Sequence, residues 1–174
     1  TLINLLLGLI KPDNGKIYLD NKEISNYNLF NQIAYVSQKT SLLDDTIKNN
    51  ITFGVPTNLI NISKINNSLK IACLNNFVEN LPKNLDTIVG EKNNKISGGQ
   101  AQRIAIARAI YSNREVIILD EATNAIDADT EEILLQNLKL LKSEKTIIFI
   151  SHNFKLFDIC DSVYHLINGK LQKK

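Results

Sequence analysis

The strongest constraint on the fold is a continuous apolar run, Val116-Ile117-Ile118-Leu119, followed directly by two carboxylates, Asp120 and Glu121. A short apolar run bounded by polar residues is typical of a strand that is buried on both faces in a parallel sheet. Carboxylates at the C-terminal end of such a strand lie at the edge where open α/β sheets bind ligands. The run therefore predicts an α/β fold with a ligand site just after Leu119.

A polar, glycine-rich turn, Ser97-Gly98-Gly99-Gln100, opens an apolar-rich segment that reaches about Tyr111 and precedes the run. At a helix start, free backbone N–H groups and the positive end of the dipole favour an anion, and glycines let the backbone approach a phosphate without a Cβ in the way. Asp120 is placed to hold Mg²⁺, directly or through water, and Glu121 to polarise an attacking water. Each half alone is equally typical of an ordinary serine-capped helix or of a strand that ends in two solvated acids. Both halves in this order indicate phosphate chemistry.

Composition narrows the class of protein. The 174 residues suit one domain with a substantial core, and the hydrophobic content of 44% and charged content of 22% are those of a globular protein. A net charge of +2 with no basic tract gives no support to a nucleic-acid partner. No apolar run has the length needed to cross a bilayer, and Cys73 and Cys160 lack metal-ligand spacing, which favours reduced thiols in a cytosolic protein.

The order ISGGQ, helix, VIILDE and EATNAID resembles the nucleotide-binding domain of ATP-binding cassette (ABC) proteins. By this resemblance, Ser97, Gly98, Gly99 and Gln100 form the ABC signature, which contacts the nucleotide, Asp120 is the Walker B aspartate that binds the metal, and Glu121 is the catalytic glutamate. The segment Asn124 to Asp127 matches the D-loop, whose Asp127 is retained, with Asn and Ile in place of the usual Ser and Leu. Ala101 departs from the family, which commonly has a basic residue after the signature.

The resemblance assigns roles to three residues that carry no signal on their own. Gln38, after a predicted strand at Ile33–Val36, matches the Q-loop glutamine, which contacts Mg²⁺ and the attacking water and couples the site to a partner domain. His152, after a predicted strand at Thr146–Ile150, matches the switch histidine that senses the γ-phosphate. Thr1 matches the last residue of a Gly-rich phosphate loop, so the chain resembles a fragment truncated just after the Walker A loop. The alternative is a complete domain with a frayed apolar start.

The implied fold is a P-loop NTPase-type, mainly parallel sheet flanked by helices, with a small antiparallel β layer at Lys16–Leu19 and Asn21–Ile24. We expect a partial nucleotide-binding domain over residues 1–174, with an all-helical signature subdomain over about residues 45–110. Apolar spacing predicts one helix from Ile62 to Leu81, ended by Pro82. We expect a helix from Thr1 to Leu9 and a short helix capped by Asp45 or Thr46. A further helix should begin with the acids at 129–132 and end with Lys139 and Lys142. The chain should end in a hairpin with its turn at Asn168-Gly169.

The resemblance also implies the function. ATP and Mg²⁺ are the expected cofactors, and the expected partners are a second nucleotide-binding domain, bound head to tail, and a transmembrane domain on the same chain or a separate one. The segments Leu42 to Gly54 and Asp86 to Glu91 resemble those of exporters, with Glu91 in a loop that meets the membrane domain, and this places the protein at the cytoplasmic face of the inner membrane. Two alternatives remain: a soluble ATPase of the same superfamily that acts on DNA or ribosomes, and an inactive fragment that only binds a partner.

Overall fold

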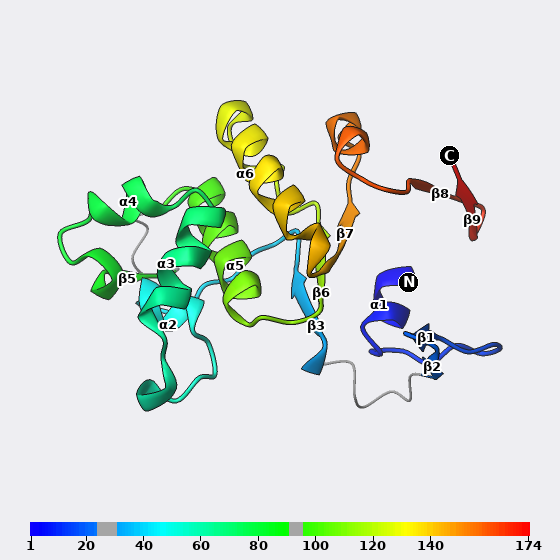
Figure 1. Cartoon of the computed structure of the whole chain (residues 1–174), viewed down its shortest axis with the longest axis horizontal. Helices are drawn as coiled ribbons and strands as arrows, with labels where there is room; N and C mark the ends of the chain where they lie inside the picture. Colours follow the sequence, from blue (N-terminus) through cyan, green and yellow to red (C-terminus); the bar gives the residue numbers. More distant parts are fainter. Residues whose placement is uncertain (24–30, 91–95) are drawn as a thin grey trace.

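The centre of the molecule is a three-stranded parallel sheet in the order β3-β6-β7 (Figure 1). The computed structural model describes residues 1–23, 31–90 and 96–174, and its central strands are β3 (Ile33–Val36), β6 (Val116–Asp120) and β7 (Thr146–Ile150). Strand β6 lies in the middle and is buried from Val116 to Leu119. This confirms the α/β fold predicted from the apolar run.

The two faces of the sheet are covered by different helices. Figure 1 shows α5 (Gly98–Tyr111) and α6 (Ala128–Leu140) on one side of the sheet and α1 (Leu2–Leu6) on the other. The alternation of side chains along β6 divides the core accordingly, since Ile117 and Leu119 join the larger cluster and Val116 and Ile118 the smaller one with Leu7. Because β6 contributes side chains to both hydrophobic clusters, it has no polar residue from Val116 to Leu119.

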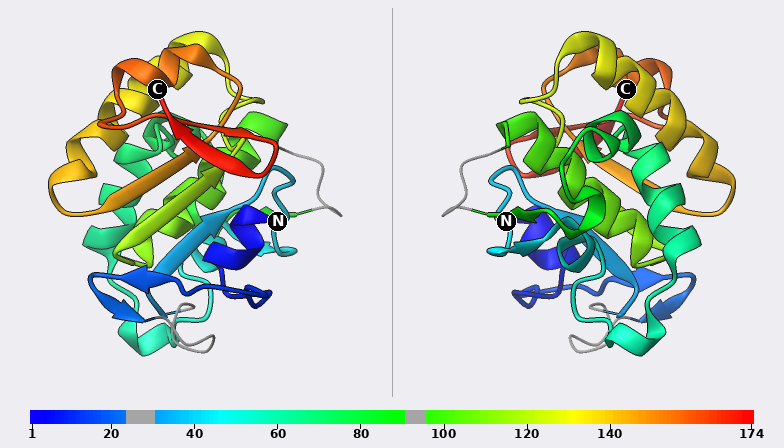
Figure 2. Two further views of the ribbon diagram at one scale, coloured as in Figure 1. Left: turned by 90° about the vertical axis from the view of Figure 1, so that its right-hand side faces the viewer. Right: turned by 90° about the vertical axis from the view of Figure 1, so that its left-hand side faces the viewer.

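The helices α2 (Ile47–Ile51), α3 (Ile62–Ile71) and α4 (Asn75–Glu79) gather with α5 beside the sheet, as both views of Figure 2 show. The prediction of one helix from Ile62 to Leu81 is wrong in its continuity, because Cys73 adopts a left-handed backbone with φ of 55° between α3 and α4. The helical signature subdomain expected over about residues 45–110 stays a prediction, and its range also contains two short strands. Strands β4 (Asp45–Thr46) and β5 (Ile88–Val89) pair antiparallel beside α2.

Two further antiparallel pairs lie outside the central sheet. Strand β1 (Tyr18–Leu19) pairs with β2 (Lys22–Glu23), which confirms the small antiparallel layer, although the predicted end at Ile24 lies outside the described residues. Strand β8 (Tyr164–Ile167) pairs with β9 (Lys170–Lys173) in the predicted C-terminal hairpin. Short 3₁₀ helices make up the remaining regular structure of the described ranges: Thr57–Leu59, Asn84–Asp86, Leu141–Ser143 and Phe154–Asp158.

Local caps explain where three helices begin and end. The Thr46 side chain accepts a hydrogen bond from the Asn49 N–H, which confirms the cap predicted for α2. Helix α1 is shorter than predicted, since it ends at Leu6 and Gly8 then adopts a left-handed φ of 69° that glycine tolerates best. Acids in the first turn of α6 and Lys139 in its last turn agree with the predicted helix.

The structure also describes the two cysteines and the apolar character of the helices. Among the residues described, no helix combines the length and the apolar character that a membrane crossing requires. Cys73 and Cys160 are free thiols, and both are half-buried. Burial is the first cause that raises the pKa of each thiol.

Candidate active site

Three strands end in residues that meet at one carboxylate. The Gln38 Nε2 group, just beyond β3, donates a hydrogen bond to Glu121 Oε2 at 2.5 Å. The His152 Nε2 atom, just beyond β7, lies 3.6 Å from Glu121 Oε1. Because β3, β6 and β7 are parallel, their C-terminal ends share one edge of the sheet. The structure therefore brings together three of the residues that the sequence assigns to catalysis.

The backbone of Glu121 is in a strained conformation. Its φ of 48° lies in the left-handed region, which costs a residue with a Cβ roughly 1–2 kcal/mol. The Glu121 N–H donates to the Ile150 carbonyl at the end of β7, at 2.8 Å, and this bond holds the conformation. Its carboxylate also accepts a hydrogen bond from Asn124 Nδ2 at 3.1 Å. The side chain of Glu121 is only 21% exposed, whereas that of His152 is 98% exposed, so the histidine faces outward from the edge.

Asp120, the last residue of β6, has a partner that sequence reasoning missed. The hydroxyl of Tyr35 on β3 donates to Asp120 Oδ2 at 2.8 Å. Partial burial, and then the hydrogen bond and negative charge of Asp120, raise the pKa of Tyr35 to about 12, so the phenol remains a donor at neutral pH. The pattern of a strand in sequence gives no sign of this bond, because it depends on the register between β3 and β6.

The oxygen donors at this edge suit a magnesium ion that a phosphate brings with it. Mg²⁺ binds hard oxygen ligands, commonly one or two carboxylates with waters and substrate phosphates completing the shell. Asp120 supplies a carboxylate, and Gln38 keeps its carbonyl oxygen available while its amide nitrogen bonds to Glu121. No group of three or more His, Cys, Asp or Glu side chains in the described ranges could hold a metal by itself. The donor set therefore fits a metal–phosphate complex better than a metal alone.

The signature residues form the start of helix α5. The Ser97 side chain accepts from the Gln100 N–H at 3.2 Å, and the Gln100 side chain accepts from the Ser97 N–H at 2.8 Å, which is a capping box. These two bonds satisfy two of the first amides of the helix. Helix geometry leaves the Gly98 and Gly99 amides without an intrahelical acceptor. The glycine amides are thus the groups at this helix start that suit an anion.

The loop after Glu121 packs on that same helix start. Gly99 is buried against the loop, and a Cβ added to it would lie 2.5 Å from the Ala125 carbonyl oxygen. Gln102, which is also buried, accepts a hydrogen bond from the Ala125 N–H at 3.1 Å. The signature helix and the loop that follows Glu121 are therefore in direct contact within one protomer. The sequence contained no signal for the contact of Gln102.

Asp127 and Thr1 are placed differently from the catalytic group. The Asp127 carboxylate caps α6 by accepting from the Thr130 N–H at 3.0 Å, and that bond is the first cause that lowers the pKa of Asp127. Thr1 precedes α1, its side chain makes no capping hydrogen bond, and the residue is exposed. Nucleotide contacts by Asp127 and Thr1 stay predictions. Glu91, assigned to a loop that meets the membrane domain, lies outside the described residues, as does Lys95 just before the signature.

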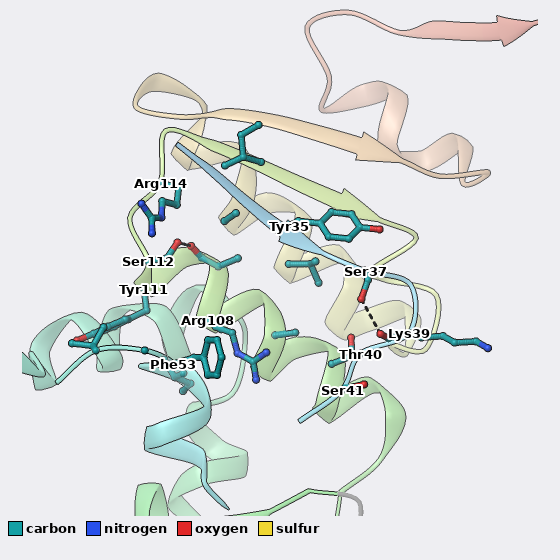
Figure 3. A pocket seen from close by; sticks show the side chains of 18 residues that line it. Tyr35, Ser37, Lys39, Thr40, Ser41, Phe53, Arg108, Tyr111, Ser112 and Arg114 are labelled. Atoms are coloured by element: carbon teal, nitrogen blue, oxygen red, sulfur yellow. Dashed lines mark hydrogen bonds between the residues drawn. The ribbon is translucent and has the colours of Figure 1, made fainter. Parts of the chain in front are cut away.

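A cavity of about 510 Å³ lies next to this site, between the end of β3, the segment after α2, and α5. Figure 3 shows Phe53 and Arg108 side by side in its wall, with Ser37, Lys39, Thr40 and Ser41 along another side. The Arg108 guanidinium lies 5.6 Å from the centre of the Phe53 ring, within cation–π range, and Phe53 is 62% exposed. The loop that borders the cavity thus includes Gln38 between two lining residues.

Asn50 joins the cavity wall to the segment that follows Gln38. It is fully buried on α2, and its amide group exchanges hydrogen bonds with the backbone N–H and C=O of Leu43. Arg108 donates to the Asn50 backbone carbonyl at 2.7 Å and to its side-chain oxygen at 3.0 Å. Burial lowers the pKa of Arg108 from its ordinary value. These bonds hold α5 and the segment around Leu43 in a fixed relation.

The family follows from a match to the sequence model described as "ABC transporter", which covers residues 1–124. The chain belongs to the ABC transporter family. This confirms the family that the signature and the Asp120-Glu121 pair predicted. The ABC domain is also 37% identical over 175 residues to an "ATP-dependent lipid A-core flippase" of Ralstonia nicotianae, over 98% of this chain and 30% of that protein.

Other relatives agree with this assignment. A "putative export ATP-binding/permease protein" of Rickettsia typhi is 39% identical over 174 residues, which is 98% of this chain and 30% of the relative. The structure of "a bacterial Atm1-family ABC exporter with ATP bound" superposes with a TM-score of 0.89 at 32% identity, over 98% of this chain and 30% of that one. The ABC domain thus spans about 30% of the length of the relatives it matches.

Proposed function

We propose that this domain binds and hydrolyses ATP and thereby powers an ABC transporter, and that this transporter is an exporter. The observation that carries the proposal is the convergence of Gln38 and His152 on the Glu121 carboxylate, one residue after Asp120. Each comes from the end of a different strand, at the edge where open α/β sheets bind ligands. Glu121 is held there in a left-handed backbone conformation, and such strained residues cluster at functional sites, which supports the proposal.

In the proposed reaction, Glu121 orients the attacking water and accepts its hydrogen bond. Gln38 and Asn124 donate to one oxygen of Glu121, which fixes the carboxylate and leaves the other oxygen, on the His152 side, for water. Asp120 and the carbonyl of Gln38 would hold Mg²⁺, which when bound neutralises charge on the phosphates. His152 is exposed and lies 3.6 Å from Glu121, and in the proposed reaction it would contact the terminal phosphate.

The signature residues would serve a nucleotide bound mainly by a second domain. Their capping box leaves the Gly98 and Gly99 amides for an anion, and Gly98 is exposed at the helix start. A head-to-tail pair would bring Ser97, Gly98 and Gly99 of one protomer against the Glu121 edge of the other, with ATP between them. Asp127 would lie in the loop at that interface, and Thr1 next to the phosphates. Binding energy at two such sites would then be converted into domain closure.

A transmembrane domain, on the same chain or a separate one, is the proposed mechanical partner. We place its contact at the cavity beside Gln38, because exposed Phe53 offers an apolar anchor there and the cavity wall includes residues on both sides of Gln38. A partner bound in the cavity would contact the loop whose Gln38 side chain bonds to Glu121. Bound to such a partner, the domain would lie at the cytoplasmic face of the inner membrane. The names of the flippase and export relatives support the exporter type.

Two other readings are less well supported. A soluble ATPase of the same superfamily would keep the same edge, but three similar relatives are named as a flippase and as export ATP-binding/permease proteins. An inactive binding module would not need Gln38, Glu121 and His152 in contact. The inactive module is the alternative that the following experiment separates from the proposed function, because it predicts no ATP turnover.

The test uses the full-length protein that contains residues 1–174 and compares ATP turnover with that of Glu121→Gln. The variant keeps the shape and hydrogen-bonding capacity of residue 121 but loses its charge, and turnover should fall by about two to four powers of ten. ATP affinity should persist, and an ATP-bound dimer of the domain should accumulate in size-exclusion chromatography. Glu132→Gln, the same change on the exposed surface of α6, is the control and should behave as the parent.

The variant Asp120→Asn distinguishes the role of Asp120 from that of Glu121. It should lose Mg²⁺-dependent nucleotide affinity as well as turnover, since Asp120 is the proposed metal ligand. Turnover at the parent rate in Glu121→Gln, or a defect confined to nucleotide affinity, contradicts the role given to Glu121. Absence of any ATP turnover in the parent protein favours the binding-module reading instead.

A further inference from the structure

The Tyr35 hydroxyl is a polar group at the proposed metal site that no motif of the family match accounts for. Tyr35 pairs in register with Ile118 on β6, and Asp120 lies two residues further along the same strand. Residues two apart on a strand face the same side, and a diagonal neighbour is within reach of an aromatic side chain. The phenol spans this diagonal and donates to Asp120 Oδ2 at 2.8 Å. In Figure 3 the ring of Tyr35 points away from Phe53 and Arg108, toward the end of β6.

The bond restricts the Asp120 carboxylate to one orientation. The backbone of Asp120 is held in β6 opposite Ile150 of β7, so rotation of the side chain is the freedom that remains. With Oδ2 engaged by the phenol, Oδ1 is the oxygen left for another ligand. Mg²⁺ demands near-ideal octahedral geometry at short distances, so a carboxylate that can turn would bind it less well than a fixed one.

The bond contributes little to folding by comparison. Tyr35 is 41% exposed, and an exposed hydrogen bond exchanges with water at small net gain. The residue is not needed to fill the core, because the buried members of β3 are Ala34 and Val36. A phenol that is half in solvent yet bonded to the carboxylate at the end of the central strand is better explained by orientation than by stability.

We propose that Tyr35 is a positioning residue for the metal-binding carboxylate: its hydroxyl fixes Asp120 so that one oxygen faces the metal–nucleotide complex. This rests on the proposed function, in which Asp120 binds Mg²⁺ with ATP. Tyr35 does not touch the nucleotide. It acts through Asp120, and its effect appears in the metal dependence of binding.

The test is Tyr35→Phe in the full-length protein that contains residues 1–174. Mn²⁺ replaces Mg²⁺, and its binding in the presence of ATP is followed by electron paramagnetic resonance, alongside ATP binding in EDTA and thermal unfolding. The apparent metal affinity should weaken about three- to tenfold, the effect of losing one bond to a charged group at a partly exposed site. ATP binding in EDTA and the unfolding temperature should stay at the parent values. Tyr164→Phe removes an exposed phenol on β8 and is the control without effect.

A double variant makes the result specific to the pair. In Asp120→Asn, the further change Tyr35→Phe should not alter metal affinity, because the oriented carboxylate is already gone. An unchanged metal affinity in Tyr35→Phe overturns the inference, and so does a loss that appears equally in EDTA or in the unfolding temperature. If the parent binds no metal–ATP complex, the proposed function fails and the inference fails with it. Parent binding with no difference in Tyr35→Phe removes the inference alone.

Discussion

Gly99 is the position where the structure makes its sharpest quantitative prediction. In Gly99→Ala the new Cβ would lie 2.5 Å from the Ala125 carbonyl oxygen, 3.2 Å from its carbonyl carbon and 3.4 Å from the Ile126 Cα. All three are backbone atoms, so no side-chain rotation relieves the overlap. Inserting a methyl group into a packed contact costs about 1–3 kcal/mol, against a gain of about 0.5–1 kcal/mol for alanine over glycine in a helix.

The expected net loss is therefore about 0–2.5 kcal/mol in the free energy of unfolding. Its middle, about 1 kcal/mol, corresponds to roughly 2–4 °C in the melting temperature of a domain of this size. Gly98→Ala is the matched control. Its Cβ would meet only the Ala125 Cβ, at the ordinary contact distance of 3.6 Å, so its stability should equal or exceed that of the parent. Thermal unfolding followed by circular dichroism, with the full-length protein or its excised nucleotide-binding domain, measures both.

Activity separates the two glycines in a second way. If the signature amides receive the partner's phosphate, Gly98→Ala should lose ATP-driven dimerisation although its stability is intact. Gly99→Ala should lose both, because the Ala125 loop must move to make room. Equal melting temperatures for the two variants would refute the argument that close approach to Ala125 demands glycine at position 99.

Two other predictions concern binding and acid stability. Residues 1–174 alone should bind ATP weakly or not at all in calorimetry, because they contain no G-x-x-x-x-G-K-[ST] loop to cradle the β- and γ-phosphates. Tight binding would contradict this. The lowered pKa of Asp127 adds stability that is fully present above its usual value of 3.8 and is lost as the pH falls through the lowered value. Asp127→Asn can still cap α6 but does not titrate. Its denaturation midpoint should therefore change less with pH below about 4 than that of the parent. An equal change in both proteins would show that the Asp127 cap is not the source of the pH dependence.

The parts of the fold that the sequence predicts are those with strong local signals. The apolar run at Val116–Leu119 is buried on both faces, and the carboxylates after it reach the shared strand edge. The cap at Thr46 also follows from residue type at a helix start. Family order supplied Gln38 and His152, which local chemistry does not single out.

The parts that the sequence does not predict depend on tertiary contacts. The break at Cys73 has no glycine or proline, and the apolar spacing runs through it. The bonds that accompany the break come from other helices, since Arg103 on α5 donates to the Cys73 carbonyl and Asn137 on α6 donates to the Ile71 carbonyl. Strands β4 and β5 have two residues each, which is too short for any periodicity. Tyr35 and Gln102 act through single hydrogen bonds between distant segments.

The left-handed backbone at Glu121 has a consequence for how such a chain would change over many generations. Catalytic residues often cost their domain some stability, and at position 121 part of that cost lies in the backbone. A glycine at position 121 would relieve roughly 1 kcal/mol of backbone strain. If the activity were no longer needed, substitution at this position would therefore favour a residue that stabilises the domain but lacks a carboxylate. The glutamate at this position therefore stands against the folding preference of its own backbone.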